Sequence, residues 1–157
     1  MSYIPRTSVE AAMGACIPSE LILWMIKFRA FVAGSAVLSY MVGSFKPNKI
    51  AIWVPNAEWH EAKLALAGME LSLVESNGCI TVTAKHTFVF TPTMYSLDET
   101  LTRFDLDVCR VAWDPSRPCL VVAQHIDAIV ARKATTRAPI EQKQRLKYIE
   151  RGFLFVN

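Results

Sequence analysis

The chain has 157 residues, of which 52% are hydrophobic and 20% are charged, and its formal net charge is +3. This composition excludes a disordered or low-complexity chain, because such chains are poor in apolar residues. Charged residues are scarcer than the roughly 25% of an average soluble domain, which predicts either a large core or an apolar surface kept for a partner. The length fits a single domain over residues 1–157.

Helices and strands are both predicted in the first part of the chain. A short apolar run that ends at Gly34-Ser35 predicts a strand turning into a helix capped by Ser35. The dipeptide Asn77-Gly78 predicts a hairpin turn. In chain order, the predicted elements are helices over 9–16 and 21–29, a strand over 30–33, a helix over 36–42, a strand over 49–54, a helix over 57–67 with an apolar stripe at Trp59 and Leu64, and strands over 71–74 and 79–90.

The second part of the chain repeats this mixture. A turn at Asp114-Pro115-Ser116 predicts that two neighbouring strands pair as a hairpin. In chain order, the predicted elements are a helix over 97–102, strands over 108–113 and 119–123, helices over 126–133 and 141–150, and a strand over 153–156. Strand-helix-strand segments followed by hairpins predict an α+β fold, in which helices flank a mixed β-sheet.

The N-terminus and the cysteines indicate the expected compartment. Residues 1–14 lack the charged region and apolar run of a signal peptide, and residues 21–45 are too polar and too interrupted for a membrane span. The cysteines show no CxxC spacing, so we expect small buried hydrophobes rather than zinc ligands or disulfides. They are Cys16, Cys79, Cys109 and Cys119. We therefore expect an intracellular protein, cytoplasmic or part of a virion, with no metal, cofactor or membrane partner.

Residues 31–54 resemble the opening of a nucleotidyltransferase-fold domain of the polymerase-beta-like superfamily. In that superfamily an apolar strand ends in Gly-Gly or Gly-Ser, a helix follows, and the next strand carries two acids one residue apart. Gly34 and Ser35 match the first element, and Lys49 and Ala51 stand where the two acids would lie. The resemblance implies a nucleotidyltransferase-like mixed sheet, with residues 1–30 forming helices that precede the part that resembles the family.

Two later segments extend the resemblance to residues 31–153. Residues 104–110, which begin Phe104-Asp105-Leu106-Asp107, and residues 145–153 are similar to signatures of uncharacterised fungal and viral relatives of this fold. The resemblance implies that Asp105 or Asp107 is the third carboxylate of the site.

The two missing acids imply lost catalysis. Alternate residues of a strand point to one face, so an acid-x-acid pair holds divalent ions against a nucleoside triphosphate, and two such ions drive phosphoryl transfer. Lys49 and Ala51 cannot supply those ligands, which indicates a pseudoenzyme without catalytic residues. Two alternatives remain open: Asp105 and Asp107 act as a pair of their own, or are structural, with Asp107 paired to Arg103 or Arg110. Lys49 either binds a phosphate as a point charge or is an ordinary surface lysine.

Positive charge gathers near the C-terminus, where seven basic residues stand against two acids between residues 132 and 151. Such a segment either binds the phosphates of a nucleic acid or is a solvated helix face. Its basic residues are Arg132, Lys133, Arg137, Lys143, Arg145, Lys147 and Arg151.

The leading hypothesis from the sequence is an inactive nucleotidyltransferase-like domain used as a protein-binding or structural module, such as a component of a viral particle or other assembly. The alternative is a nucleotide- or nucleic-acid-binding protein with residual transferase activity.

Overall fold

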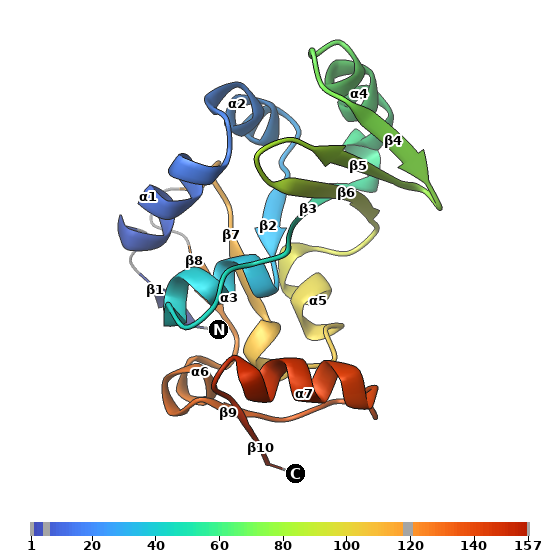
Figure 1. Ribbon diagram of the computed structural model, residues 1–157. Helices are drawn as coiled ribbons and strands as arrows, with labels where there is room; N and C mark the ends of the chain where they lie inside the picture. Colours follow the sequence, from blue (N-terminus) through green and yellow to red (C-terminus); the bar gives the residue numbers. More distant parts are fainter. Residues whose placement is uncertain (1, 5–6, 118–120, 157) are drawn as a thin grey trace.

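The computed structural model describes residues 2–4, 7–117 and 121–156 (Figure 1). Within them, eight strands form one mixed sheet in the order β1-β8-β7-β2-β3-β6-β5-β4, in which the pair β3 and β6 is parallel and the other neighbours are antiparallel. These strands are β1 (Ser2–Ile4), β2 (Phe31–Ala33), β3 (Lys49–Pro55), β4 (Leu73–Ser76), β5 (Cys79–Thr83), β6 (Thr87–Thr93), β7 (Val111–Trp113) and β8 (Val121–Ala123). The predicted α+β class with a mixed sheet flanked by helices is confirmed.

Helices lie on the sheet and at one end of it (Figure 1). They are α1 (Thr7–Cys16), α2 (Ser19–Lys27), α3 (Ser35–Val42), α4 (Asn56–Ala67), α5 (Leu97–Thr102), the 3-10 helix η1 (Asp107–Cys109), α6 (Ile126–Ala131) and α7 (Gln142–Glu150). Two short strands, β9 (Lys133–Ala134) and β10 (Leu154–Phe155), pair in parallel as a separate sheet beside α6 and α7. In the part of the chain described, no single helix is long and apolar enough to cross a membrane, although α1 and α2 would pass on length and composition as a pair bent by 112°.

One face of the sheet is buried under helices α1 to α4. Strand β3 turns Ile50, Ile52 and Val54 to this face, and each is at most 1% exposed. Trp24 of α2 packs edge-on against Phe90 of β6, with ring centroids 5.2 Å apart. Burying side chains of this size contributes about 1.5–3 kcal/mol each, so this face holds the main core.

The opposite face of the sheet is covered over part of its width. Helix α5 packs Leu97 and Leu101 against Phe31 and Ala33 of β2, together with residues of β7 and β8. On neighbouring β3, the residues of this face are half-buried or exposed, because α5 does not extend over them. The uncovered edge beside α5 is therefore where a ligand can reach the sheet.

Several predicted elements need correction. The strand expected over 79–90 is two strands joined at Ala84–His86, a turn that has no glycine or proline to mark it. The strand expected over 108–113 begins with the turn η1, and that over 71–74 lies two residues later in the chain. In α4 the buried residues are Ala62 and Leu66, whereas Leu64 is 58% exposed. Residues 119 and 120, including Cys119, lie outside the described residues.

The N-terminal segment does more than precede the fold. Strand β1 forms the edge of the main sheet against β8, and Val9 and Met13 of α1 belong to the same hydrophobic cluster as β3. Residues 1–30 are therefore not only helical. They share the core of the remaining chain, which explains part of the high apolar content.

Candidate functional site

A cavity of about 360 Å³ lies on the uncovered side of β3. It is lined by Gly34 and Ser35 between β2 and α3, by Lys49 and Ala51 of β3, and by Asp105 from the loop after α5. Lys49 and Ala51 share one face of the strand because they are two residues apart. The structure thus brings together five of the six positions that the sequence analysis proposed as a degenerate site.

Gly34 fixes the turn at the mouth of this cavity. Its φ of 98° and ψ of −145° lie in a region used almost only by glycine, and it occupies the N-cap position of α3. The expectation that Ser35 caps the helix is wrong, since Ser35 is the first helical residue and no side-chain cap is present. The first-turn N–H groups of a helix have no partner within it, so the uncapped end of α3 presents free donors near the cavity.

The two acids Asp105 and Asp107 lie in different surroundings, and only Asp105 lines the cavity. Asp105 is exposed and lines the cavity, while its backbone oxygen accepts a hydrogen bond from the N–H of Arg137 at 2.8 Å. Asp107 begins η1, and its Oδ1 accepts from the N–H of Thr135 at 2.9 Å. The expected ion pair of Asp107 with Arg103 or Arg110 is absent among the described residues. Asp107 therefore has a structural role, and Asp105 is left at the site.

This donor set does not fit a pair of divalent ions. Such ions need several oxygen ligands, chiefly carboxylates, but β3 offers an ammonium group and a methyl group. On neighbouring β6 the register partners of Lys49 and Ala51 are Thr87 and Val89, so that strand adds no acid. Across the described ranges, no three side chains of His, Cys, Asp and Glu form a group that could hold a metal ion. The residues present favour an anion over a cation.

Helix α7 supplies another wall of the cavity. Gln144 and Tyr148, one turn apart, line it, and Lys147 stands beside them. Burial lowers the pKa of Lys147, and the charges of Arg151, Lys143 and Lys49 lower it further. Lys147 therefore interacts electrostatically with Lys49, which is far from it in the sequence, and the helix adds positive charge beside the cavity.

The basic C-terminal residues divide into two kinds. Three guanidinium groups lie over aromatic rings and support the fold: Arg132 over Phe153, Arg145 over Phe155, and Arg151 over Phe45 and Tyr148. Arg132 also donates to the backbone oxygen of Val42 at 2.9 Å. The remaining ones, Lys133, Arg137, Lys143 and Lys147, are exposed. The segment is not one uniform binding face, and Lys147 is the member that interacts electrostatically with Lys49.

Beneath the cavity lies a buried thiol. The Cys109 Sγ is 3.0 Å from the Tyr148 hydroxyl, and burial raises the pKa of Cys109 to about 11, against the opposing effects of the Tyr148 hydrogen bond and the Arg151 charge. Burial also raises the pKa of Tyr148. Both groups therefore stay protonated near neutral pH and do not cancel the positive charge above them.

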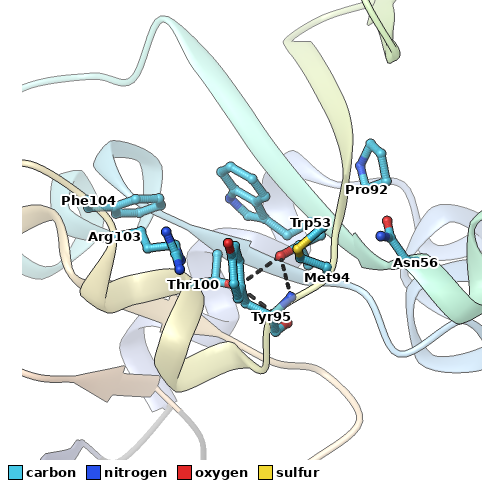
Figure 2. A pocket seen from close by; sticks show the side chains of 9 residues that line it. Trp53, Asn56, Pro92, Met94, Tyr95, Thr100, Arg103 and Phe104 are labelled. Atoms are coloured by element: carbon cyan, nitrogen blue, oxygen red, sulfur yellow. Dashed lines mark hydrogen bonds between the residues drawn. The ribbon is translucent and has the colours of Figure 1, made fainter.

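A second cavity, of about 520 Å³, adjoins the first and was not predicted from the sequence. Arg103 and Phe104 line both cavities. Figure 2 shows Trp53 above the centre of this cavity's lining and Tyr95 below it, with Phe104 and Arg103 to the left. Side chains alternate along a strand, so Trp53 lies on the same face of β3 as Lys49 and Ala51. This alternation could have identified Trp53 as a site residue from the sequence.

Hydrogen bonds fix the loop that closes this second cavity. The Thr93 and Thr100 hydroxyl oxygens are 3.1 Å apart, and the Tyr95 N–H donates to Thr93 Oγ1 at 3.2 Å. Figure 2 draws these bonds between the end of β6 and α5. The loop that carries Met94 and Tyr95 is therefore tied to a rigid helix.

Comparison with solved structures identifies the architecture. A CCA-adding enzyme in complex with ATP is 14% identical, with a TM-score of 0.72 over 100% of this chain and 43% of that chain. The Thermotoga maritima CCA-adding enzyme complexed with tRNA is 14% identical, with a TM-score of 0.70 over 100% of this chain and 44% of that one. A tRNA nucleotidyltransferase complexed with a primer tRNA and an ATP analogue is 16% identical, with a TM-score of 0.54 over 66% and 34%.

The chain thus spans less than half the length of these enzymes. No protein-family model and no curated protein sequence matches it. Likeness at this level of identity concerns the fold alone, and on that point it agrees with the resemblance noted in the sequence: the chain has a nucleotidyltransferase-like α+β fold.

Proposed function

We propose that the chain is a catalytically inactive nucleotidyltransferase-like protein that binds the phosphates of a nucleotide or RNA without a divalent ion. One observation carries the proposal: Lys49 lies in the same cavity as Gly34 and Ser35, at the position where the family resemblance expects a metal-binding acid. A lysine there supplies directly the positive charge that a metal ion would otherwise bring.

The surroundings of Lys49 support an anionic ligand. The uncapped N-terminus of α3 offers backbone donors and the positive end of the helix dipole. Lys147 adds an ammonium group that interacts electrostatically with Lys49, and Lys143 adds one that interacts with Lys147. Asp105 is the one carboxylate among the residues that line the cavity. The net charge at the cavity is therefore positive, which favours phosphate groups.

The structural neighbours include complexes with ATP, CTP and tRNA. Those ligands belong to the neighbours, which are longer proteins. They make nucleotides and RNA the first ligands to test here.

Two assays test the proposal. Incubation with labelled nucleoside triphosphates, tRNA and Mg²⁺ or Mn²⁺ is expected to yield no transfer, because the metal ligands are missing; transfer by the unmodified chain would refute the inactivity. In calorimetry with ATP, Lys49→Ala removes a charged hydrogen-bond donor and is expected to weaken binding about 10-fold or more. The matched control is Lys133→Ala, an exposed lysine outside the cavity, which leaves the affinity unchanged. Equal losses in both variants would show diffuse surface binding instead.

A second candidate function, binding to a protein partner or an assembly, rests on a different surface. Helix α7 packs against β10, and apolar side chains are exposed on α7, on β10 and directly after it. Leu146 and Ile149 are 48% and 46% exposed, and Leu154 and Val156 are 66% and 43% exposed. Sedimentation at increasing concentration tests self-association through this surface. Association that Leu146→Lys abolishes supports an assembly role, and a monomer at high concentration counts against it.

A further inference from the structure

We propose that the second cavity, beside the phosphate site, binds a nucleobase that stacks on Trp53 and Phe104. This inference rests on the proposed function, because the base would belong to the same ligand whose phosphates lie against Lys49. It extends that function by assigning the ligand's aromatic part to residues that no motif marked. A free nucleotide and an unpaired base of RNA carry the same chemistry, and the experiment below separates these sources.

The walls of the cavity suit a flat aromatic ring. The ring centroids of Trp53 and Phe104 are 5.8 Å apart with a tilt of 46°, so the two rings do not stack on each other. The guanidinium group of Arg103 lies 3.6 Å from the centre of the Tyr95 ring. Aromatic and guanidinium planes are the surfaces on which proteins stack unpaired bases.

Polar groups accompany the rings at this cavity. The indole Nε1 of Trp53 is buried and has no hydrogen-bond partner among the described residues. An indole N–H is a donor only, and because this one is buried, a ligand in the cavity reaches it only when the side chains around it shift. A base offers ring nitrogens or carbonyl oxygens as acceptors, and Asn56 at the rim can both donate and accept. These groups favour a heterocycle over a lipid or an aliphatic chain.

The two cavities are placed for one ligand. Lys49, Ala51 and Trp53 follow one another along the same face of β3, at about 3.3 Å per residue. Arg103 and Phe104 form the wall between the cavities and line both. A molecule with its phosphates at Lys49 and its base at Trp53 would therefore run along the strand past Ala51, whose small side chain leaves room for it.

The test compares ligands that carry the phosphates, the nucleoside or both. Calorimetry is performed with ATP, inorganic triphosphate and adenosine on the unmodified chain and on Trp53→Leu. Trp59→Leu, a half-buried tryptophan of α4 outside the cavity, is the matched control. Stacking is worth about 1–3 kcal/mol per base, so ATP is expected to bind about 5- to 160-fold more tightly than triphosphate. Trp53→Leu should remove that difference while leaving triphosphate binding unchanged.

The outcomes separate the two claims. Equal affinity of the unmodified chain for ATP and triphosphate overturns the base site, as does an equal loss for both ligands in Trp53→Leu. If triphosphate does not bind but adenosine binds and depends on Trp53, the base site stands and the phosphate proposal fails. Trp53→Phe keeps an aromatic face without the N–H group and should give an intermediate affinity, in a variant whose melting temperature confirms folding.

A final arm identifies the source of the base. A single-stranded oligonucleotide that binds in a Trp53-dependent way, more tightly than the same sequence held in a duplex, indicates an unpaired RNA base. Preference for ATP over the oligonucleotide indicates a free nucleotide. An oligonucleotide and ATP that both bind independently of Trp53 overturn the inference.

Discussion

Replacing Gly34 by alanine tests how the site is built. At a φ of 98° an alanine is strained whatever the space, and a backbone held in such a region costs about 1–3 kcal/mol. The new Cβ would also lie 3.3 Å from Cε2 of Phe104, which forces the ring that separates the two cavities to shift. We expect a loss of about 2–4 kcal/mol in the free energy of unfolding when both effects act.

The free energy of unfolding is measured by urea titration, and two other glycines serve as matched controls in it. Gly43→Ala meets nothing within 4 Å but has a φ of 71°, so it carries only the left-handed strain of about 1–2 kcal/mol. Gly14→Ala lies inside helix α1 in open space and should stabilise by about 0.5–1 kcal/mol. Each kcal/mol corresponds to about 2–4 °C in melting temperature for a chain of this size. A Gly34→Ala variant as stable as Gly43→Ala would refute the account of Phe104 packed against the turn.

Two further predictions concern stability. Trp24 donates its buried Nε1–H to the Ala62 oxygen of α4 at 3.0 Å, so Trp24→Phe should lose about 1 kcal/mol or more in urea unfolding. Trp59 is half-buried, and Trp59→Phe should change the free energy of unfolding little. An equal loss in both variants would contradict the role of the Trp24 hydrogen bond. The pKa of Cys109 is raised from 9.0 to about 11, so the folded chain keeps this proton to a higher pH than the unfolded chain. The free energy of unfolding should therefore be unaffected by this group below pH 9 and fall between pH 9 and 11, by at most about 1.4 kcal/mol per pH unit. Cys109→Ala should flatten that fall, and a stability that rises through the window in the unmodified chain contradicts the burial of the thiol.

Local patterns predicted much of the fold because they act over a few residues. The β-branched run over 49–54 predicted a strand with Lys49 and Ala51 on one face, and the structure buries Ile50, Ile52 and Val54 on the other. Gly43 ends α3 with a φ of 71°, as its position after the apolar run indicated. The split between β5 and β6 was missed because Ala84–His86 turns the chain without the residues that usually mark turns.

The arrangement of the site depended on contacts over long sequence separations. The sequence placed Gly34, Lys49 and Asp105 at one site only through the family resemblance. No local sequence pattern indicated that α7 lies against that site. There Tyr148 forms a hydrogen bond with Cys109, and Lys147 interacts electrostatically with Lys49. The second cavity was missed because Trp53 was considered only as part of a strand and Phe104 only as part of a motif, and only tertiary packing shows that Trp53 Nε1 has no partner among the described residues.

The central proposal is that Lys49 supplies the positive charge that metal ions would otherwise bring to the phosphates. The most direct measurement is the affinity for ATP by calorimetry, first with excess EDTA and then with Mg²⁺. A site built around Lys49, with Lys147 beside it, should bind ATP at least as tightly in EDTA, because the free anion carries more negative charge than its magnesium complex. Added salt should weaken that binding. Binding that appears only when Mg²⁺ is present would contradict the account.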